Sequence, residues 1–233
     1  MRANDTHAPA PGAASIAPVK ASHSSVSGPA KKREHIPTAS GTVGPYFPPH
    51  FFRAGDNDLT LIEPDAPRAQ GQRIHISGHV YEANRVPRFN TIIELWQADA
   101  GGRFAHPNDP RHADADPHFI GWGRTWTDQD GYFEFFTVKP GAYLDPVSKQ
   151  PRAPHINVSF TGSGLMRRLV TTMFFAGEAG NESDPALSAI PETILRTHLM
   201  LQLATNTRAP AGVPGYVIDF SLQGDSETPF FAD

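Results

Sequence analysis

The chain has 233 residues with 20 Gly, 23 Pro and 15 Phe, which predicts one large β domain or two small domains, many turns and few long helices. The formal net charge of −4 gives no basic surface for nucleic acid. Cysteine is absent, which excludes disulfides, thiolate metal sites and cysteine nucleophiles, so any metal must be held by His, Tyr, Asp or Glu.

Residues 1–38 are rich in Ala, Pro, Ser and Lys and show no periodicity. Such a segment buries too little apolar surface to offset its ordering entropy. We therefore predict a flexible N-terminal extension followed by one domain over residues 39–233. The extension lacks the apolar core of an export signal, and no apolar run approaches the roughly 18 residues of a membrane span. We expect a cytoplasmic protein without a membrane segment.

The domain is expected to begin near residues 42–47, where Gly-Pro favours a turn. Apolar runs, several alternating with polar residues, then predict strands. The predicted strands cover residues 73–80, 91–97, 123–127, 132–138, 155–160, 169–175 and 216–222. Residues 190–204 are predicted as the one helix, because apolar residues recur at helical spacing between Ile194 and Leu201. Strands separated by turns, with one late helix, predict an all-β fold of the β-sandwich type.

One segment, residues 139–160, brings Tyr143 and His155 together across a Pro-rich loop and runs directly into a strand. His155, Asn157 and Ser159 lie on one face of that strand, and the intervening apolar residues lie on the other. A Tyr and a His in this arrangement indicate part of a metal or substrate site. The preceding loop, 103–117, is long enough to be functional. Histidines at 106, 112 and 118 match no helix or strand face, so we interpret them as solvated.

Four motifs in a fixed order resemble those of the intradiol ring-cleaving dioxygenases. They are ELWQADAGG (94–102), TDQDGY (127–132), KPGAY (139–143) and PHIN (154–157). Each motif alone is weak, but the ordered set is specific, and the resemblance extends from about residue 40 to the C-terminus. It implies a β-sandwich that, in active members, holds a ferric ion with two tyrosinates and two histidines, ligands suited to a hard Lewis acid.

The resemblance places these four ligand positions at Phe104, Tyr143, His155 and Asn157. Phenylalanine has no ligating atom, and a neutral amide is a poor replacement for imidazole. Half of the ligand shell is therefore missing, and we expect a degenerate metal site and no catalytic residue in this chain. Without their partners, Tyr143 and His155 are interpreted as a hydrogen-bonded pair. Arg152 is interpreted as the partner of a carboxylate.

A heteromeric member of the family joins an iron-bearing β chain to a homologous α chain whose own site is degenerate. This sequence follows the α pattern, so the resemblance implies a homologous catalytic β chain as partner, with Fe(3+) held there. It also implies that the turn formed by Thr42, Gly44, Pro45 and Tyr46 lines the substrate pocket of that partner. The position of a substrate-contacting arginine is Ser163 here.

The implied substrate is a small catechol acid, 3,4-dihydroxybenzoate, which O2 cleaves between its hydroxyls to 3-carboxy-cis,cis-muconate. Two other hypotheses stay open at this point. One is a self-sufficient intradiol dioxygenase with an altered ligand set and another catechol as substrate. The other is a non-enzymatic sandwich module.

Overall fold

The computed structural model describes residues 52–231. The predicted N-terminal extension and the turn residues Thr42, Gly44, Pro45 and Tyr46 lie outside the described residues. The strands are β1 (Arg73–Tyr81), β2 (Thr91–Trp96), β3 (Trp122–Trp126), β4 (Tyr132–Val138), β5 (Tyr143–Leu144), β6 (Pro151–Arg152), β7 (His155–Gly162), β8 (Leu169–Phe175), β9 (Met200–Ala204), β10 (Gly215–Val217) and β11 (Phe220–Ser221). The α-helices are α1 (Pro185–Ser188) and α2 (Thr193–Thr197).

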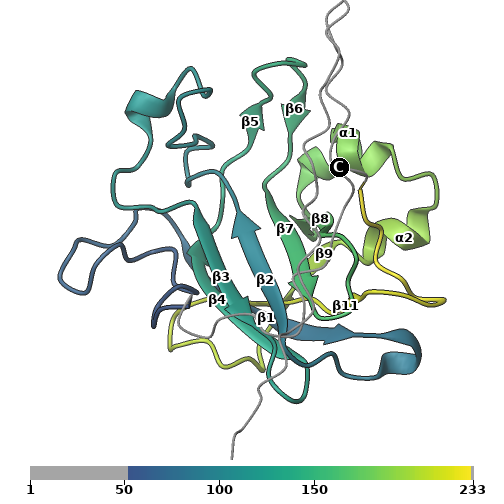
Figure 1. Cartoon of the computed structure of the whole chain (residues 1–233). Coiled ribbons are helices and arrows are strands. Elements are labelled where there is room, and N and C mark those ends of the chain that lie inside the picture. The colour runs from purple at the N-terminus through teal and green to yellow at the C-terminus, as the bar shows by residue number, and fades with distance from the viewer. Residues whose placement is uncertain (1–51, 232–233) are drawn as a thin grey trace, which may run out of the picture. The chain divides into compact units, whose positions relative to one another are not determined.

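Two layers of strands enclose the hydrophobic core (Figure 1). One layer contains β4, β1 and β10, and the other contains β8, β7, β2 and β3. Strand β9 joins them, because it pairs antiparallel with β10 on one side and parallel with β8 on the other. Ile76 and Phe135 of the first layer pack in one cluster with Ile93, Val158 and Phe160 of the second. The predicted all-β sandwich is confirmed.

Strand β7 shows the predicted alternation. Ile156, Val158 and Phe160 are fully buried in the core between the layers. His155 points to the opposite face, where it is buried at 4 % exposure next to Phe174. A second, smaller apolar cluster around Phe174, formed largely by the 187–199 region, covers that face. The strand thus places its polar residues outside the main core.

The prediction of a helix over residues 190–204 is wrong for its second half. Helix α2 ends at Thr197, and Met200–Ala204 form strand β9. The apolar spacing predicted that Ile194 and Leu201 would share one buried helix face. In the structure Ile194 is 66 % exposed, whereas Leu201 is fully buried. Strand pairing explains why residues 200–204 are extended. The segment lies between β8 and β10, and as a strand it satisfies the backbone hydrogen-bonding groups of both neighbours.

The predicted strand over 216–222 is divided at Ile218 and Asp219. Both pieces, β10 and β11, pair in parallel with β1. At the break the Asp219 carboxylate accepts the His79 backbone N–H at 3.0 Å. Gly78 makes the break possible, because a Cβ at this position would lie 1.6 Å from the Ile218 carbonyl oxygen. The 216–222 strand is therefore divided at the point where the backbone of Ile218 lies against Gly78.

The Gly78→Ala variant is expected to lower the free energy of unfolding by about 1–3 kcal/mol, because the added methyl group forces β1 and β10 apart. Urea unfolding at neutral pH measures the change. Gly180→Ala is the matched control, since its added Cβ would meet no neighbour closer than 3.4 Å. Equal stability of the two variants would contradict the role assigned to Gly78.

Candidate functional site

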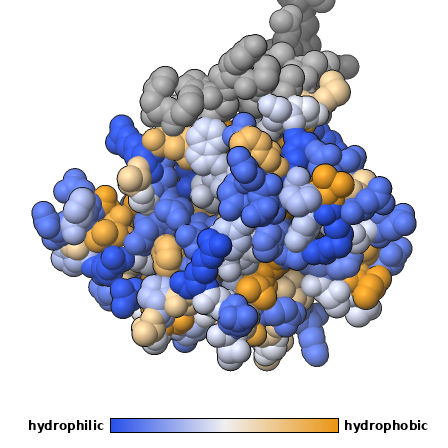
Figure 2. Space-filling view, turned by 90° about the horizontal axis from the view of Figure 1, so that it is seen from below, coloured by the Kyte–Doolittle hydropathy of each residue, from blue (hydrophilic) through white to orange (hydrophobic). Residues whose placement is uncertain are grey.

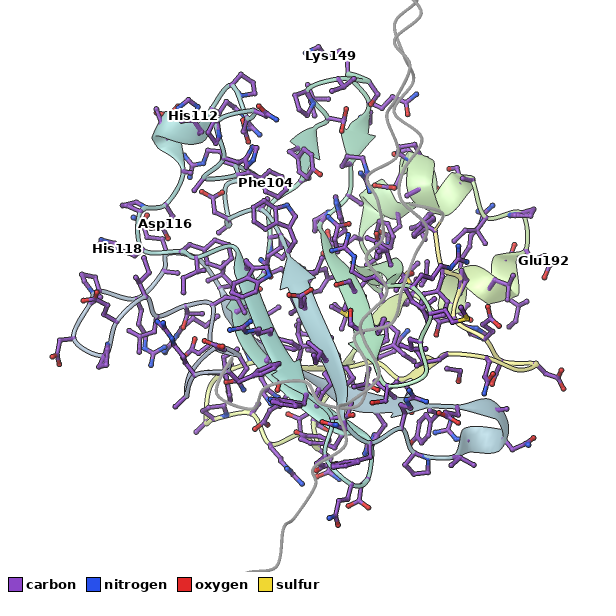
Figure 3. All side chains as sticks on the ribbon, viewed as in Figure 1. Phe104, His112, Asp116, His118, Lys149 and Glu192 are labelled. Carbon is purple, nitrogen blue, oxygen red and sulfur yellow. The ribbon has the colours of Figure 1, made fainter. Side chains whose placement is uncertain are left out.

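The loop between β2 and β3 and the β5–β6 hairpin project from the same end of the sandwich (Figure 1). A cleft of about 570 Å³ lies between them. In Figure 3, Phe104 lies between the loop that carries His112 and the hairpin that carries Lys149. The principal lining residues come from the end of β2 (Trp96), the loop (Phe104, His106, Arg111) and the hairpin (Tyr143, Lys149).

Three aromatic rings form the base of this cleft. Phe104 stacks on Trp96 with ring centroids 5.8 Å apart, and it meets Tyr143 edge-on at 5.3 Å. Trp96 is 40 % exposed and lines the cleft. The cleft therefore offers an open aromatic surface, which the sequence did not indicate.

Tyr143 and His155 are joined directly. The Tyr143 hydroxyl lies 3.3 Å from Nε2 of His155, and Nδ1 of His155 lies 2.6 Å from the Ala153 carbonyl oxygen. Because a carbonyl only accepts, the ring proton sits on Nδ1, and Nε2 accepts the Tyr143 hydroxyl. The hydrogen bond expected from the sequence is confirmed.

The site holds both side chains uncharged. Burial, with a smaller effect of the nearby Arg152 guanidinium, lowers the pKa of His155 from 6.5 to about 4. Burial also raises the pKa of the Tyr143 hydroxyl above its ordinary value. A neutral imidazole and a neutral phenol are the forms that the hydrogen bond between them requires.

The depressed pKa of His155 predicts a pH-dependent stability. Between pH 6.5 and about 4 the unfolded chain protonates His155 and the folded chain does not, so stability falls as the pH falls through this window. The full effect is about 3 kcal/mol. Urea unfolding of the protein and of His155→Gln between pH 7 and pH 4 measures it. Parallel stability curves for the two proteins would contradict the prediction.

Phe104 and Asn157 lie next to this pair but supply no suitable donors. Asn157 shares the outward face of β7 with His155, lies opposite Trp96 in the β2–β7 register, and its Oδ1 accepts the Thr172 hydroxyl at 3.0 Å. Phe104 presents only a ring. The four positions therefore do not fit a ferric ion. The side chains of Tyr143 and His155 bond to each other, Asn157 offers only a neutral amide, and Phe104 has no ligating atom. Within residues 52–231 no group of three His, Cys, Asp or Glu side chains could hold a metal.

Asp184 supports the pair and was missed in the sequence. It is fully buried, and its carboxylate accepts Arg152 Nε at 3.0 Å and the Ala153 N–H at 2.9 Å. Its other oxygen accepts the Ala186 N–H and so caps α1. The expected pairing of Arg152 with a carboxylate is confirmed. The Asp-Pro start of α1 is a capping signal that would have found this residue.

The remaining predicted residues lie elsewhere. His106 and His112 are exposed and His118 is half-buried, which agrees with solvated loop positions. Ser163 is exposed just after β7, and its carbonyl oxygen accepts the guanidinium of Arg88. Strand β7 separates Ser163 from His155 by roughly 25 Å at about 3.3 Å per residue. No helix between residues 52 and 231 is long and apolar enough to cross a membrane.

Comparison with known proteins identifies the family. The family model described as Dioxygenase matches residues 43–224. A solved structure of 3-chlorocatechol 1,2-dioxygenase from Rhodococcus opacus superimposes with a TM-score of 0.55 at 22 % identity, covering 86 % of this chain and 72 % of that chain. The chain belongs to the intradiol ring-cleaving dioxygenases, a family of enzymes.

Two curated relatives refine this assignment. The chain is 34 % identical over 206 residues to the protocatechuate 3,4-dioxygenase alpha chain of Pseudomonas putida, covering 83 % of this chain and 95 % of that relative. It is 37 % identical over 177 residues to the beta chain of Burkholderia cepacia, covering 75 % and 74 %. The two identities are close, so the overall likeness does not choose between the two kinds of chain.

Proposed function

We propose that this chain is the α-type subunit of a heteromeric intradiol dioxygenase. It docks on a homologous β-type chain that carries the Fe(3+), and it completes the substrate pocket of that chain. The complex acts in the cytoplasm on 3,4-dihydroxybenzoate. The bond between the two hydroxyl-bearing carbons breaks, both atoms of O2 enter the product, and 3-carboxy-cis,cis-muconate is formed.

The observation that carries this proposal is the state of the four ligand positions. Tyr143 and His155 bond to each other, while Phe104 and Asn157 provide neither a phenolate nor an imidazole. A chain of this family without a ligand shell for iron needs a partner that has one. The alignment with nearly the full length of an alpha chain supports the same choice.

The position of Ser163 supports a role toward a neighbour. Ser163 lies at the opposite end of β7 from the Tyr143–His155 pair, so it cannot contact a substrate bound at that pair. A substrate-contacting residue at this position therefore suits a pocket on a neighbouring chain better than a substrate at the Tyr143–His155 pair. We assign the same role to Thr42, Gly44, Pro45 and Tyr46, on the resemblance of their turn.

The surface around Ser163 has exposed apolar residues suited to docking. Gly162, at the end of β7, pairs with Thr91, at the start of β2, so the 82–90 connection and the 163–168 turn adjoin. They carry Val86, Phe89 and Met166, which are 55 %, 59 % and 74 % exposed. Figure 2 views the molecule from the end at which β7 finishes, and it shows separate apolar patches among hydrophilic residues.

Co-expression with a homologous chain that has Tyr and His at the positions matching Phe104 and Asn157 tests the proposal. The two chains are expected to co-purify, with iron and O2 uptake in the complex and neither in this chain alone. Stoichiometric iron and ring cleavage by the lone chain would favour the self-sufficient enzyme instead. A stable lone chain that joins no such partner would favour the non-enzymatic module.

Substitutions on the proposed docking surface locate the contact. Phe89→Ser and Met166→Ser are expected to weaken co-purification, because each removes an exposed apolar side chain from the interface. Leu203→Ser is the matched control, since Leu203 is 68 % exposed on β9, away from these connections. Equal effects of all three substitutions would place the interface elsewhere.

A further inference from the structure

The turn that follows β7 presents a thioether to solvent. Met166 lies in this turn and is 74 % exposed. The other two methionines in the described part of the chain are better protected. Met173 is fully buried in the core, and Met200 is half-buried, with its sulfur 3.9 Å from Asn181 Nδ2. Cysteine is absent from the chain, so Met166 carries the most exposed sulfur of the described residues, and an oxidant of sulfur meets it first.

The fold holds this turn in place, so the exposure of Met166 is a fixed feature. Leu165 packs against the hydrophobic core, and its N–H donates to the Gly162 carbonyl at 3.2 Å. Arg88, from the connection between β1 and β2, donates to the Ser163 carbonyl, and its side chain is only 18 % exposed. A turn held at these points keeps the side chain of Met166 in solvent on the proposed docking surface.

The thioether of a methionine is a two-electron reductant. A lone pair of the sulfur attacks one oxygen of hydrogen peroxide, so the S–O bond forms and the O–O bond breaks. The hydroxyl proton on the transferred oxygen passes to the leaving hydroxide, which becomes water. The product, methionine sulfoxide, carries a polar oxygen in place of an apolar sulfur. An apolar contact that buries this oxygen without a donor must bear the cost of its desolvation.

We propose that Met166 is an oxidation site at which peroxide controls the docking of this chain on its partner. The reduced thioether is the apolar side chain that docking uses beside Val86 and Phe89, and the sulfoxide weakens that contact. Once the complex has formed, the same contact covers the sulfur and slows its oxidation. This control rests on the proposed docking of the chain, and it adds a redox dependence that docking by itself does not require.

Peroxide treatment of the purified full-length chain tests the modification without any partner. After removal of the peroxide and digestion with trypsin, mass spectrometry reads each residue separately, because Met166, Met173 and Met200 fall in three different peptides. The Met166 peptide is expected to gain one oxygen atom while the other two stay unmodified. Oxidation of Met173 or Met200 before Met166 overturns the proposed site.

Binding of the treated chain to the homologous iron-bearing chain measures the effect on docking. The treated chain, freed of peroxide before mixing, is expected to bind at least about fivefold more weakly, because an apolar contact of the interface is lost. Reduction by the two epimer-specific methionine sulfoxide reductases should restore binding. Met166→Leu is the matched control, since it stays apolar without a sulfur and should bind equally well before and after peroxide. Met166→Gln, which is polar without oxidation, should bind weakly in both cases.

Docking before and after oxidation separates the two proposals. If the untreated chain joins no iron-bearing partner, the proposed function fails and the oxidation control falls with it. If the untreated chain joins the partner and the oxidised chain joins it equally well, docking stands and only the oxidation control is overturned. Loss of docking by peroxide-treated Met166→Leu also overturns it, because another residue then carries the effect.

Discussion

The double variant Phe104→Tyr/Asn157→His is expected to bind ferric iron at least about 100-fold more tightly than the unaltered chain, since even outer partners of metal ligands are worth 10–100-fold. The Phe104 ring already touches Tyr143, and Asn157 shares the outward face of β7 with His155. A phenol and an imidazole at these two positions therefore join the existing pair at one end of the sandwich. The hydrogen bond between Tyr143 and His155 must open, which opposes binding but does not prevent it.

Metal analysis after ferric loading and dialysis measures this change, and a visible tyrosinate–iron absorption band reports the ligands. Each single variant is a control, because it supplies only three of the four donors and should retain less iron. A double variant that folds normally yet stays free of iron would contradict the expectation. In that case the residues around the ligand positions have diverged as well.

The Asp184→Ala variant is expected to lose about 3–5 kcal/mol of unfolding free energy, because Arg152 is left without its partner inside the protein. Asp184 is fully buried, and the Arg152 side chain is 16 % exposed. The change also removes the acceptor of the Ala153 N–H and the cap of α1. Urea unfolding at neutral pH, followed by circular dichroism, measures the loss.

Two further variants separate the contributions of Asp184. Asp184→Asn keeps a capping oxygen without the charge, so its loss should lie between that of Asp184→Ala and zero. Asp225→Ala removes an exposed carboxylate and should change stability by less than about 0.5 kcal/mol. If Asp184→Ala is no less stable than Asp225→Ala, the hydrogen bonds of Asp184 to Arg152, Ala153 and Ala186 do not stabilise the contact between β6 and α1.

The fold could be predicted where neighbouring residues alone carried the signal. Alternation along β7 gave the correct buried face, because side chains of a strand point to opposite sides. The errors arose where distant segments decide. Residues 200–204 form a strand only because β8 and β10 lie on either side, and the 216–222 strand breaks only because Ile218 approaches Gly78.

The candidate site was predicted in part. The ligand positions came from the family resemblance, since Phe104, Tyr143 and His155 belong to a loop, a hairpin and a strand that only the fold brings together. The short hairpin β5–β6 was interpreted as a Pro-rich loop, and the cleft beside it was not foreseen. The Asp-Pro capping signal could have located Asp184, but its pairing with Arg152, 32 residues earlier in the chain, could not be read from the sequence.

The parallel pairing of β1 with β10 and β11 bears on how the polypeptide acquires its structure. Ile76 pairs with Tyr216 and Val80 with Phe220, so the first long strand pairs with segments that are synthesised much later. Contacts between such distant segments slow folding, because a large loop must close before they form. During synthesis one edge of β1 stays unpaired until residues 215–221 have emerged, and an unpaired strand edge can pair with another chain and aggregate.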